Sequence, residues 1–109
     1  MASEVERGDI RLYRFAARDK RRPVLVLSRS AALRHLRTAV VAPVTTTIRG
    51  LPSEVLVGAA AGLKADSVVN LDHLYTVSQS KLGRWLGRLD EIRMREVCRA
   101  VAVALGCES

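Results

Sequence analysis

The sequence predicts one small, mainly β domain, a barrel or twisted sheet of five to six mostly antiparallel strands followed by a single C-terminal helix. Short apolar or alternating runs recur up to residue 89 and are separated by Gly, Pro and Asp turn signals. From residue 90 on, the hydrophobic period becomes helical. Because the chain has 109 residues and no repeat or linker-like segment, we expect residues 1–109 to form a single domain with one core.

The first half of the chain contains three predicted strands. Residues 8–15 open with a Gly-Asp turn signal and alternate apolar with polar residues. Residues 23–28, "PVLVLS", form a continuous apolar run, which is typical of a strand covered on both faces. Residues 38–46, "TAVVAPVTT", contain Pro43, which has no N–H to donate, so an edge strand or a bulge is expected there.

Three further strands are predicted before the helix. They are "EVLV" at 54–57, the longer "SVVNLDHLYTV" at 67–77, and "LGRWLGRL" at 82–89. The segments between them carry Gly, Pro or Ser, as turns do, and lie at 48–53, 58–66 and 78–81. Six short strands and one terminal helix favour a barrel of the SH3-like kind.

The terminal helix is predicted over residues 90–106. Asp90 is the N-cap candidate and Gly106 the C-terminal stop. One set of side chains falls at helical spacing and is expected to form the core face: Met94, Val97, Cys98, Val101, Ala102 and Leu105.

Positive charge is concentrated in the first third of the chain. The net charge is +7, and residues 11–37 alone hold nine basic residues against the single acid Asp19. Such a surface binds polyanions, because Arg and Lys neutralise phosphates and release counterions. A solvated surface that only keeps the protein soluble is the alternative.

The spacing of the two cysteines and the lack of a long apolar run argue against several classes of protein. Cys98 and Cys107 lie nine residues apart without a CxxC motif or a Cys/His cluster, so we expect free thiols and neither a zinc site nor a disulfide framework. The N-terminal ten residues hold no apolar block, and the longest apolar run is about six residues. We therefore expect a cytoplasmic protein without a membrane segment.

Five segments occur in an order that is typical of one protein family. They are "RGDI" at 7–10, "RRPVLVLS" at 21–28, "VVAPVTTTIRGLPSEV" at 40–55, "GLKADSVVNLD" at 62–72 and "KLGRWLGRL" at 81–89. In this order and at these separations they resemble the MazF/PemK family of toxin endoribonucleases. The resemblance covers nearly the whole chain, from about residue 6 to about residue 106.

The resemblance implies an activity and two protein partners. It implies an SH3-like barrel that forms a homodimer and cuts single-stranded RNA at short specific sequences, without a metal ion or other cofactor. The 2′-hydroxyl of the RNA is the nucleophile, and the products are a cyclic phosphate and a free 5′-hydroxyl. A cognate MazE-like antitoxin with a disordered acidic tail blocks the RNA groove. The dimer would also explain why residues 23–28 are apolar on both faces.

Arg22 directly precedes Pro23 at the predicted start of a strand. Attack of a 2′-oxygen on phosphorus requires a cation beside the non-bridging oxygens, and a guanidinium supplies this charge as a planar fork. The resemblance implies that Arg22 is a principal catalytic residue. Without the resemblance, a surface Arg at a strand end is the simpler interpretation.

Two threonines follow Pro43 and Val44 at the predicted end of the third strand. A hydroxyl there can donate a hydrogen bond to a phosphate oxygen on which charge develops. Family members carry Thr or Ser here, which implies a catalytic role for Thr45 and a phosphate-binding role for Thr46. On their own, β-branched residues are ordinary at a strand end.

Asp72 and His73 close the polar part of the predicted strand 67–77. The family often has Asp followed by Gln here, and some members have Arg where this chain has Asn70. Asp72 is thus a catalytic candidate that orients another group or reads a base edge, and a buried structural Asp is the alternative. A histidine can serve as an acid or a base, but His73 and Asp72 as neighbours in a strand should point to opposite faces. We therefore assign His73, together with Asn70, to RNA binding.

The segment between the first two predicted strands departs from the family. Relatives have a longer mobile loop that covers the RNA and often contains Gly, Glu or Gln, whereas "FAARDKRRP" at 15–23 is short and basic. We therefore expect Arg18, Lys20 and Arg21 to bind phosphates in place of part of the hydrogen-bond readout.

Three other side chains have open interpretations. Tyr75 stands where relatives tend to carry Arg or Lys, and it either stacks on a base or covers the barrel surface. Trp85, the single tryptophan, is expected to pack against the helix. His35 is expected on a basic surface that faces RNA or solvent.

Two other functions fit the same fold. A gyrase-poisoning toxin of the CcdB type depends on C-terminal residues, often a Trp near the end, which "VALGCES" does not offer. A non-catalytic nucleic-acid-binding module would keep the basic groove without the chemistry.

Overall fold

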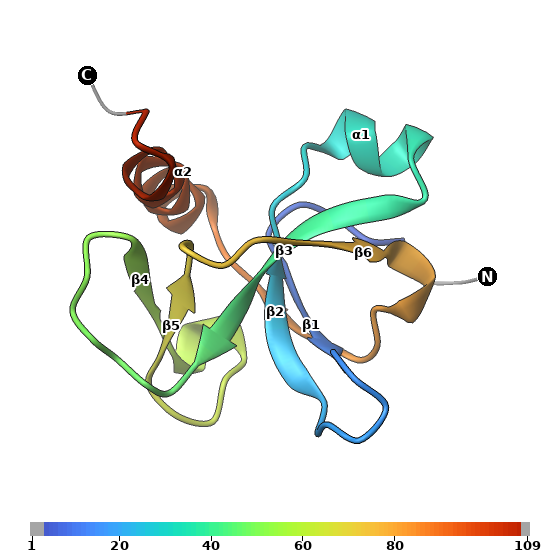
Figure 1. Ribbon diagram of the computed structural model, residues 1–109, viewed down its shortest axis with the longest axis horizontal. Coiled ribbons are helices and arrows are strands. Elements are labelled where there is room, and N and C mark those ends of the chain that lie inside the picture. The colour runs from blue at the N-terminus through green and yellow to red at the C-terminus, as the bar shows by residue number, and fades with distance from the viewer. Residues whose placement is uncertain (1–3, 108–109) are drawn as a thin grey trace.

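The computed structural model describes residues 4–107, which form a strongly bent, SH3-like antiparallel half-barrel of seven strands with two α-helices (Figure 1). The strand order is β4-β5-β3-β2-β1-β7, and β6 pairs with β3 outside this path. The strands are β1 (Asp9–Tyr13), β2 (Arg22–Val26), β3 (Thr38–Thr45), β4 (Glu54–Val57), β5 (Ser67–Asn70), β6 (Tyr75–Ser78) and β7 (Trp85–Arg88). The helices are α1 (Ser30–His35) and α2 (Glu91–Leu105), with single 3-10 turns η1 (Ala59–Ala61) and η2 (Gln79–Lys81). The predicted fold class is confirmed.

β3 is the strand on which the sheet is organised. Its first half pairs with β6 up to Val41, and its end pairs with β5 from Val44 on. Pro43 lies between these two ladders, where a missing N–H is tolerated. The sequence predicts an edge strand or a bulge at Pro43. The structure shows neither, because Pro43 lies where a central strand changes its partner.

The predicted strand 67–77 is wrong, because the chain forms two strands there. β5 and β6 both pair antiparallel with β3, but the register shifts between the two ladders, so the chain must leave the sheet between them. The turn is fixed by the side-chain oxygen of Asn70, which accepts the N–H of Asp72 at 3.0 Å. Asp72 and His73 thus lie in a turn rather than in a strand, and the strand argument about the direction of His73 does not apply.

α1 is absent from the sequence prediction. Its six residues are good helix formers, but a turn and a half is too short to show a helical period. Ala32 and Leu33 are its buried residues. The helix covers one face of the sheet close to the start of β3 (Figure 1).

The middle of β2 is buried on both faces by this one chain. Leu25 belongs to a core that includes Met94 and Val97 of α2. Val24 and Val26 belong to a second core, with Leu33 of α1. All three β2 side chains have 0% exposure, so no second subunit is needed to explain why residues 23–28 are apolar on both faces.

The capping of α2 is confirmed. Asp90 Oδ1 accepts the N–H of Arg93 at 2.8 Å, and Gly106 ends the helix at φ 72°. The predicted core face is only partly right: the fully buried residues are Met94, Val97 and Ala100, whereas Cys98 and Leu105 are exposed. Both Cys98 and Cys107 are free thiols, as predicted.

Two glycines allow η1 to close against β7. A Cβ at Gly62, which has φ +84°, would lie 2.0 Å from the carbonyl oxygen of Leu86. A Cβ at Gly87 would lie 2.1 Å from the carbonyl oxygen of Ala61. Only glycine permits this approach, which joins the two ends of the bent sheet.

A buried carboxylate joins β1 to β7. Asp9 is 1% exposed, and its Oδ1 accepts hydrogen bonds from Trp85 Nε1 at 3.2 Å and Arg88 Nε at 2.9 Å. The hydrogen bond to Asp9 is the main cause that raises the pKa of Arg88 above its ordinary value. Trp85 is 52% exposed, so the expectation that it packs against the helix is wrong.

Replacing Asp9 with Ala should destabilise the fold by about 3 kcal/mol, because the change removes one partner of a buried ion pair and leaves Arg11, itself 5% exposed, beside an empty site. Glu6→Ala is the matched control, since it removes only the exposed Glu6–Arg88 pair and should cost less than about 1 kcal/mol. Urea unfolding followed by circular dichroism measures both. Equal losses in the two variants would contradict the assigned role of Asp9.

Candidate nucleic-acid interface

Arg22 and Thr45 are brought together at neighbouring strand ends. β2 and β3 are antiparallel with Val24 opposite Pro43, and continuing this register by two residues sets Arg22 opposite Thr45. Side chains two residues apart share a face, so both lie on the same side of the sheet as Val24. Figure 1 shows the end of β3 between β2 and β5.

The Arg22 guanidinium is available to a ligand. Arg22 is exposed, and its side chain takes part in no hydrogen bond or ion pair within residues 4–107. On its other side β1 contributes Tyr13, which is paired with Arg22 in the register. A guanidinium fork at this place can bind a phosphate in bidentate fashion.

The Thr45 hydroxyl is oriented by its own backbone. Its Oγ1 accepts the N–H of Thr47 at 3.1 Å, which leaves the hydroxyl hydrogen free to be donated. Thr46 follows directly and is exposed. The strand end thus presents the Thr45 hydroxyl on the face of the sheet that it shares with Arg22.

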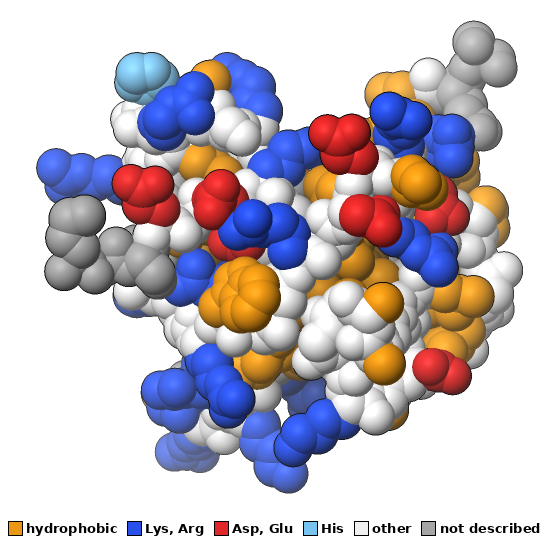
Figure 2. Space-filling model, turned by 180° about the vertical axis from the view of Figure 1, so that it is seen from behind, with side chains coloured by type: hydrophobic (Ala, Val, Ile, Leu, Met, Phe, Trp, Pro, Cys, Tyr) orange, Lys and Arg blue, Asp and Glu red, His pale blue; other side chains and the backbone are white. Residues whose placement is uncertain are grey.

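The basic loop between β1 and β2 is exposed along its length, including Arg18, Lys20 and Arg21. It covers a hollow of about 550 Å³ that is lined by three cations, Arg14, Arg21 and Lys81, and by Tyr13 and Phe15. Lys and Arg side chains gather at the lower end of the molecule in Figure 2, which is the end where Figure 1 shows this loop. Such a lining suits a phosphate chain.

Sequence reasoning missed Arg14 and Lys81. Arg14 could have been found from its place beside the loop, but Lys81 joins the hollow through the fold, from η2.

Three aromatic rings form a row beside Arg22. The centroids of Tyr13 and Phe15 lie 4.9 Å apart in an edge-on arrangement, and those of Phe15 and Tyr75 lie 4.8 Å apart. Tyr75 is 42% exposed, so a base has a face to stack on. The sequence indicated Tyr75 alone; the i, i+2 spacing of Phe15 and Tyr13, the last residue of β1, was the signal for the other two.

Asp72 lies in the turn after β5, away from the ends of β2 and β3 in the topology. Its Oδ2 accepts the hydroxyl of the buried Ser53 at 2.5 Å, while Oδ1 makes no hydrogen bond within residues 4–107. Asn70 lies two residues from Val68, which pairs with Thr45, but its side-chain oxygen is used by the N–H of Asp72. His73 is exposed in the same turn.

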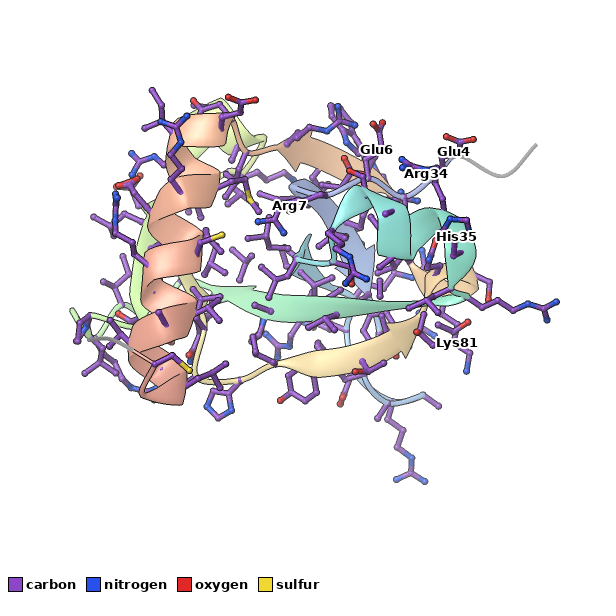
Figure 3. All side chains as sticks on the ribbon, turned by 90° about the horizontal axis from the view of Figure 1, so that it is seen from above. Glu4, Glu6, Arg7, Arg34, His35 and Lys81 are labelled. Carbon is purple, nitrogen blue, oxygen red and sulfur yellow. The ribbon has the colours of Figure 1, made fainter. Side chains whose placement is uncertain are left out.

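His35 lies apart from these residues. It is exposed in the last turn of α1, which follows the far end of β2 from Arg22. In Figure 3, His35 and Arg34 project from the side of α1 that faces away from α2, while Arg7 lies between the two helices. The expected solvent surface describes His35 better than an RNA-facing one.

Neither a metal centre nor a membrane helix is visible in the described part of the chain. Residues 4–107 hold no group of three or more His, Cys, Asp and Glu side chains that could bind a metal ion. None of the helices there is long and apolar enough to cross a membrane.

Residues 6–105 match the family model described as PemK-like, MazF-like toxin of type II toxin-antitoxin system. This match spans all strands and both helices described above. The chain belongs to the PemK/MazF toxin family.

Curated members of the PemK/MazF family from Mycobacterium tuberculosis are close in sequence. "Probable endoribonuclease MazF5" is 53% identical over 88 residues, which cover 80% of this chain and 81% of the relative. "Endoribonuclease MazF3" is 46% identical over 80 residues, which cover 73% and 78%. These matches identify the chain as an endoribonuclease of the PemK/MazF family.

Solved structures of the family share the fold. "Mycobacterium tuberculosis toxin MazF-mt6" superposes with a TM-score of 0.84 at 38% identity, over 93% of this chain and 99% of that one. A mycobacterial "Endoribonuclease in complex with its cognate antitoxin" superposes with a TM-score of 0.86 at 30% identity, over 96% and 98%. That protein therefore has a form in which an antitoxin is bound.

Proposed function

We propose that this endoribonuclease cuts single-stranded RNA at a phosphate held between Arg22 and Thr45. The 2′-hydroxyl gives up its proton and its oxygen attacks phosphorus, the bond from phosphorus to the 5′-oxygen breaks, and the leaving 5′-oxygen takes up a proton. The products are a 2′,3′-cyclic phosphate and a 5′-hydroxyl. The reaction uses no metal ion. The observation that carries the proposal is the β2–β3 register, which sets an unpaired guanidinium opposite a free hydroxyl donor.

Arg22 and Thr45 act on the charge that develops in the transition state. The guanidinium binds the non-bridging oxygens of the phosphate, and the Thr45 hydroxyl donates to one of them. Thr46 binds a phosphate oxygen beside them. These interactions strengthen as the phosphorus becomes five-coordinate, so they lower the barrier more than they raise substrate affinity.

Asp72 contacts the RNA from the turn between β5 and β6. Its Oδ2 is held by Ser53, and Oδ1 remains free to accept a hydrogen bond from a base edge of the RNA that extends beyond the cut. His73, which is exposed, contacts the RNA beside Asp72, whereas the buried Asn70 acts by holding the turn. The aromatic row of Tyr13, Phe15 and Tyr75 stacks on a base next to the cut, and this contact contributes to sequence preference.

The loop cations bind phosphates beyond the cut. If Lys20 and Arg21 each contact one phosphate, changing both to Gln should flatten the plot of log affinity against log salt by about 1.4, since each contact to a single strand contributes about 0.7. Arg95 and Arg99 on α2 are equally exposed and their double Gln variant is the control. Fluorescence anisotropy with labelled RNA over a salt series measures both slopes. An unchanged slope in the loop variant would show that the loop faces away from RNA.

Two protein partners complete the proposal. We expect a homodimer, and the apolar groove between α1 and α2 is the face that a second copy would cover: it is lined by Leu27, Leu36, Val40, Leu74, Val97 and Val101, and Leu36 is 56% exposed. A cognate antitoxin of the MazE kind would bind the basic cleft and compete with RNA. Family relatives support this, since one structure is described as an endoribonuclease with its cognate antitoxin and another as MazE-MazF from Deinococcus radiodurans.

The proposal is tested by incubating the purified protein with a long single-stranded RNA in EDTA and mapping the ends. Cuts at a short recurrent sequence, with cyclic phosphate on one side and 5′-hydroxyl on the other, are expected. Cleavage that stops in EDTA would refute the metal-free mechanism. Binding without cleavage would indicate a non-catalytic module, and DNA breaks that require gyrase would indicate a CcdB-type toxin.

A further inference from the structure

The loop between β3 and β4 is fastened by a single carboxylate oxygen. Oε1 of Glu54 accepts the N–H groups of Arg49 at 3.1 Å, Gly50 at 2.9 Å and Leu51 at 3.3 Å. Gly50 has φ +71°, which allows the three N–H groups to converge. In return, the Glu54 N–H donates to the Leu51 carbonyl at 3.0 Å. The loop of residues 46–53 is therefore held by hydrogen bonds to Glu54, the first residue of β4.

The same loop contacts a proposed site residue at each end. At its start, the N–H of Thr47 holds Oγ1 of Thr45. At its end, the Ser53 hydroxyl donates to Asp72, and the Ser53 carbonyl accepts the N–H of Leu71 at 3.0 Å. A change in the loop's conformation would move the Thr47 N–H and release the Thr45 hydroxyl.

The second oxygen of Glu54 is not explained by folding alone. Oε2 is buried and makes no hydrogen bond within residues 4–107. An unpaired buried carboxylate oxygen costs free energy, and a Glu that only kept the surface soluble would turn it to water. The Glu54 side chain is thus held with Oε1 on the loop amides, while Oε2 is left without a hydrogen bond.

We propose that Glu54 is a positioning residue for RNA cleavage, which holds the β3–β4 loop so that Thr47 can orient the Thr45 hydroxyl toward the phosphate. The inference rests on the proposed catalytic role of Thr45. Glu54 touches neither the RNA nor the reacting atoms. Its effect passes through the three loop amides and Thr47, and a misplacement of about 1 Å at a reacting group can lower a rate by about 10²-fold.

The test compares Glu54→Ala and Glu54→Gln with Glu96→Ala, which removes a surface carboxylate paired only with Arg93 on α2. Glu54→Ala should lower kcat on a short RNA substrate by about 10²-fold and change KM by less than about threefold. The amide hydrogens of Arg49, Gly50 and Leu51 should exchange faster in the same variant. Glu54→Gln keeps a neutral acceptor oxygen, so its kcat should be intermediate, and Glu96→Ala should match the wild type.

A double variant separates this inference from the proposed function. If Glu54 acts through Thr45, adding Glu54→Ala to Thr45→Val should lower kcat by no more than about threefold beyond Thr45→Val alone. A full multiplication of the two losses, or wild-type kcat in Glu54→Ala beside a slow Thr45→Val, would overturn the positioning role alone. Wild-type kcat in Thr45→Val would overturn the proposed function together with this inference. Should the Ala variant fail to fold, the Gln variant is used in the same cycle.

Discussion

Replacing Arg22 with Ala should lower kcat/KM for RNA cleavage by about 10³-fold while the fold is retained. The loss is large because the guanidinium is the charge that the β2–β3 register sets opposite Thr45, beside the non-bridging oxygens in the proposed site. The fold should be retained because the Arg22 side chain is exposed and makes no hydrogen bond or ion pair within residues 4–107. Discontinuous RNA cleavage assays and a thermal melt measure the two quantities.

Two comparisons make the Arg22 result specific. Arg99→Ala removes an exposed Arg from α2 and should leave kcat/KM within about twofold of the wild type. Arg22→Lys keeps the charge but not the bidentate fork, so it should recover only part of the rate. An Arg22→Ala protein that cleaves at the wild-type rate would remove Arg22 from the site.

Replacing Thr45 with Val should lower kcat by about 10²-fold and change KM by less than about threefold. Val has nearly the same shape as Thr, so the change removes the hydroxyl donor and little else. An interaction made chiefly in the transition state affects kcat, whereas one made equally with bound substrate affects KM. Single-turnover and steady-state measurements on one RNA oligonucleotide separate the two.

Thr76→Val on β6 is the matched control, because Thr76 is an exposed strand threonine that lies outside the proposed site. It should leave both constants unchanged. If Thr45→Val instead raises KM and leaves kcat unchanged, Thr45 binds the phosphate without taking part in the chemical step.

Much of the site could be predicted because its members stand at strand ends that are marked in the sequence. Pro23 marks the start of β2, and Thr45 follows an apolar run. What the sequence does not contain is the register that sets these two ends side by side, because strand pairing depends on long-range contacts. The juxtaposition of Arg22 and Thr45 therefore had to come from the fold.

The errors in the sequence prediction have local causes. The segment 67–77 is apolar enough to suggest one strand, and the break after Asn70 depends on the Asn70 side-chain oxygen, which accepts the backbone N–H of Asp72. Trp85 was expected in the core on account of its size, but Asp9 supplies a partner for its N–H at the surface. The hydrogen bonds of Glu54 to the β3–β4 loop could not be predicted from the sequence, since they join one carboxylate to three backbone amides and no residue pattern marks them.

The basic loop and the aromatic row suggest a division of work. In the proposed site, phosphate contacts from the loop would supply affinity without sequence information, whereas stacking beside the cut and the polar groups of the β5–β6 turn would supply preference. A shortened, cationic loop thus need not prevent specific cleavage. It should make RNA binding more sensitive to salt than binding by relatives with longer, less charged loops.

A crystal structure with an RNA strand that carries a 2′-deoxy nucleotide at the mapped cut site tests the central claim most directly, because the missing nucleophile prevents cleavage. The account predicts one phosphate with the Arg22 guanidinium and the Thr45 Oγ1 both about 3 Å from its oxygens. A cut-site phosphate bound elsewhere, out of reach of either side chain, would contradict it.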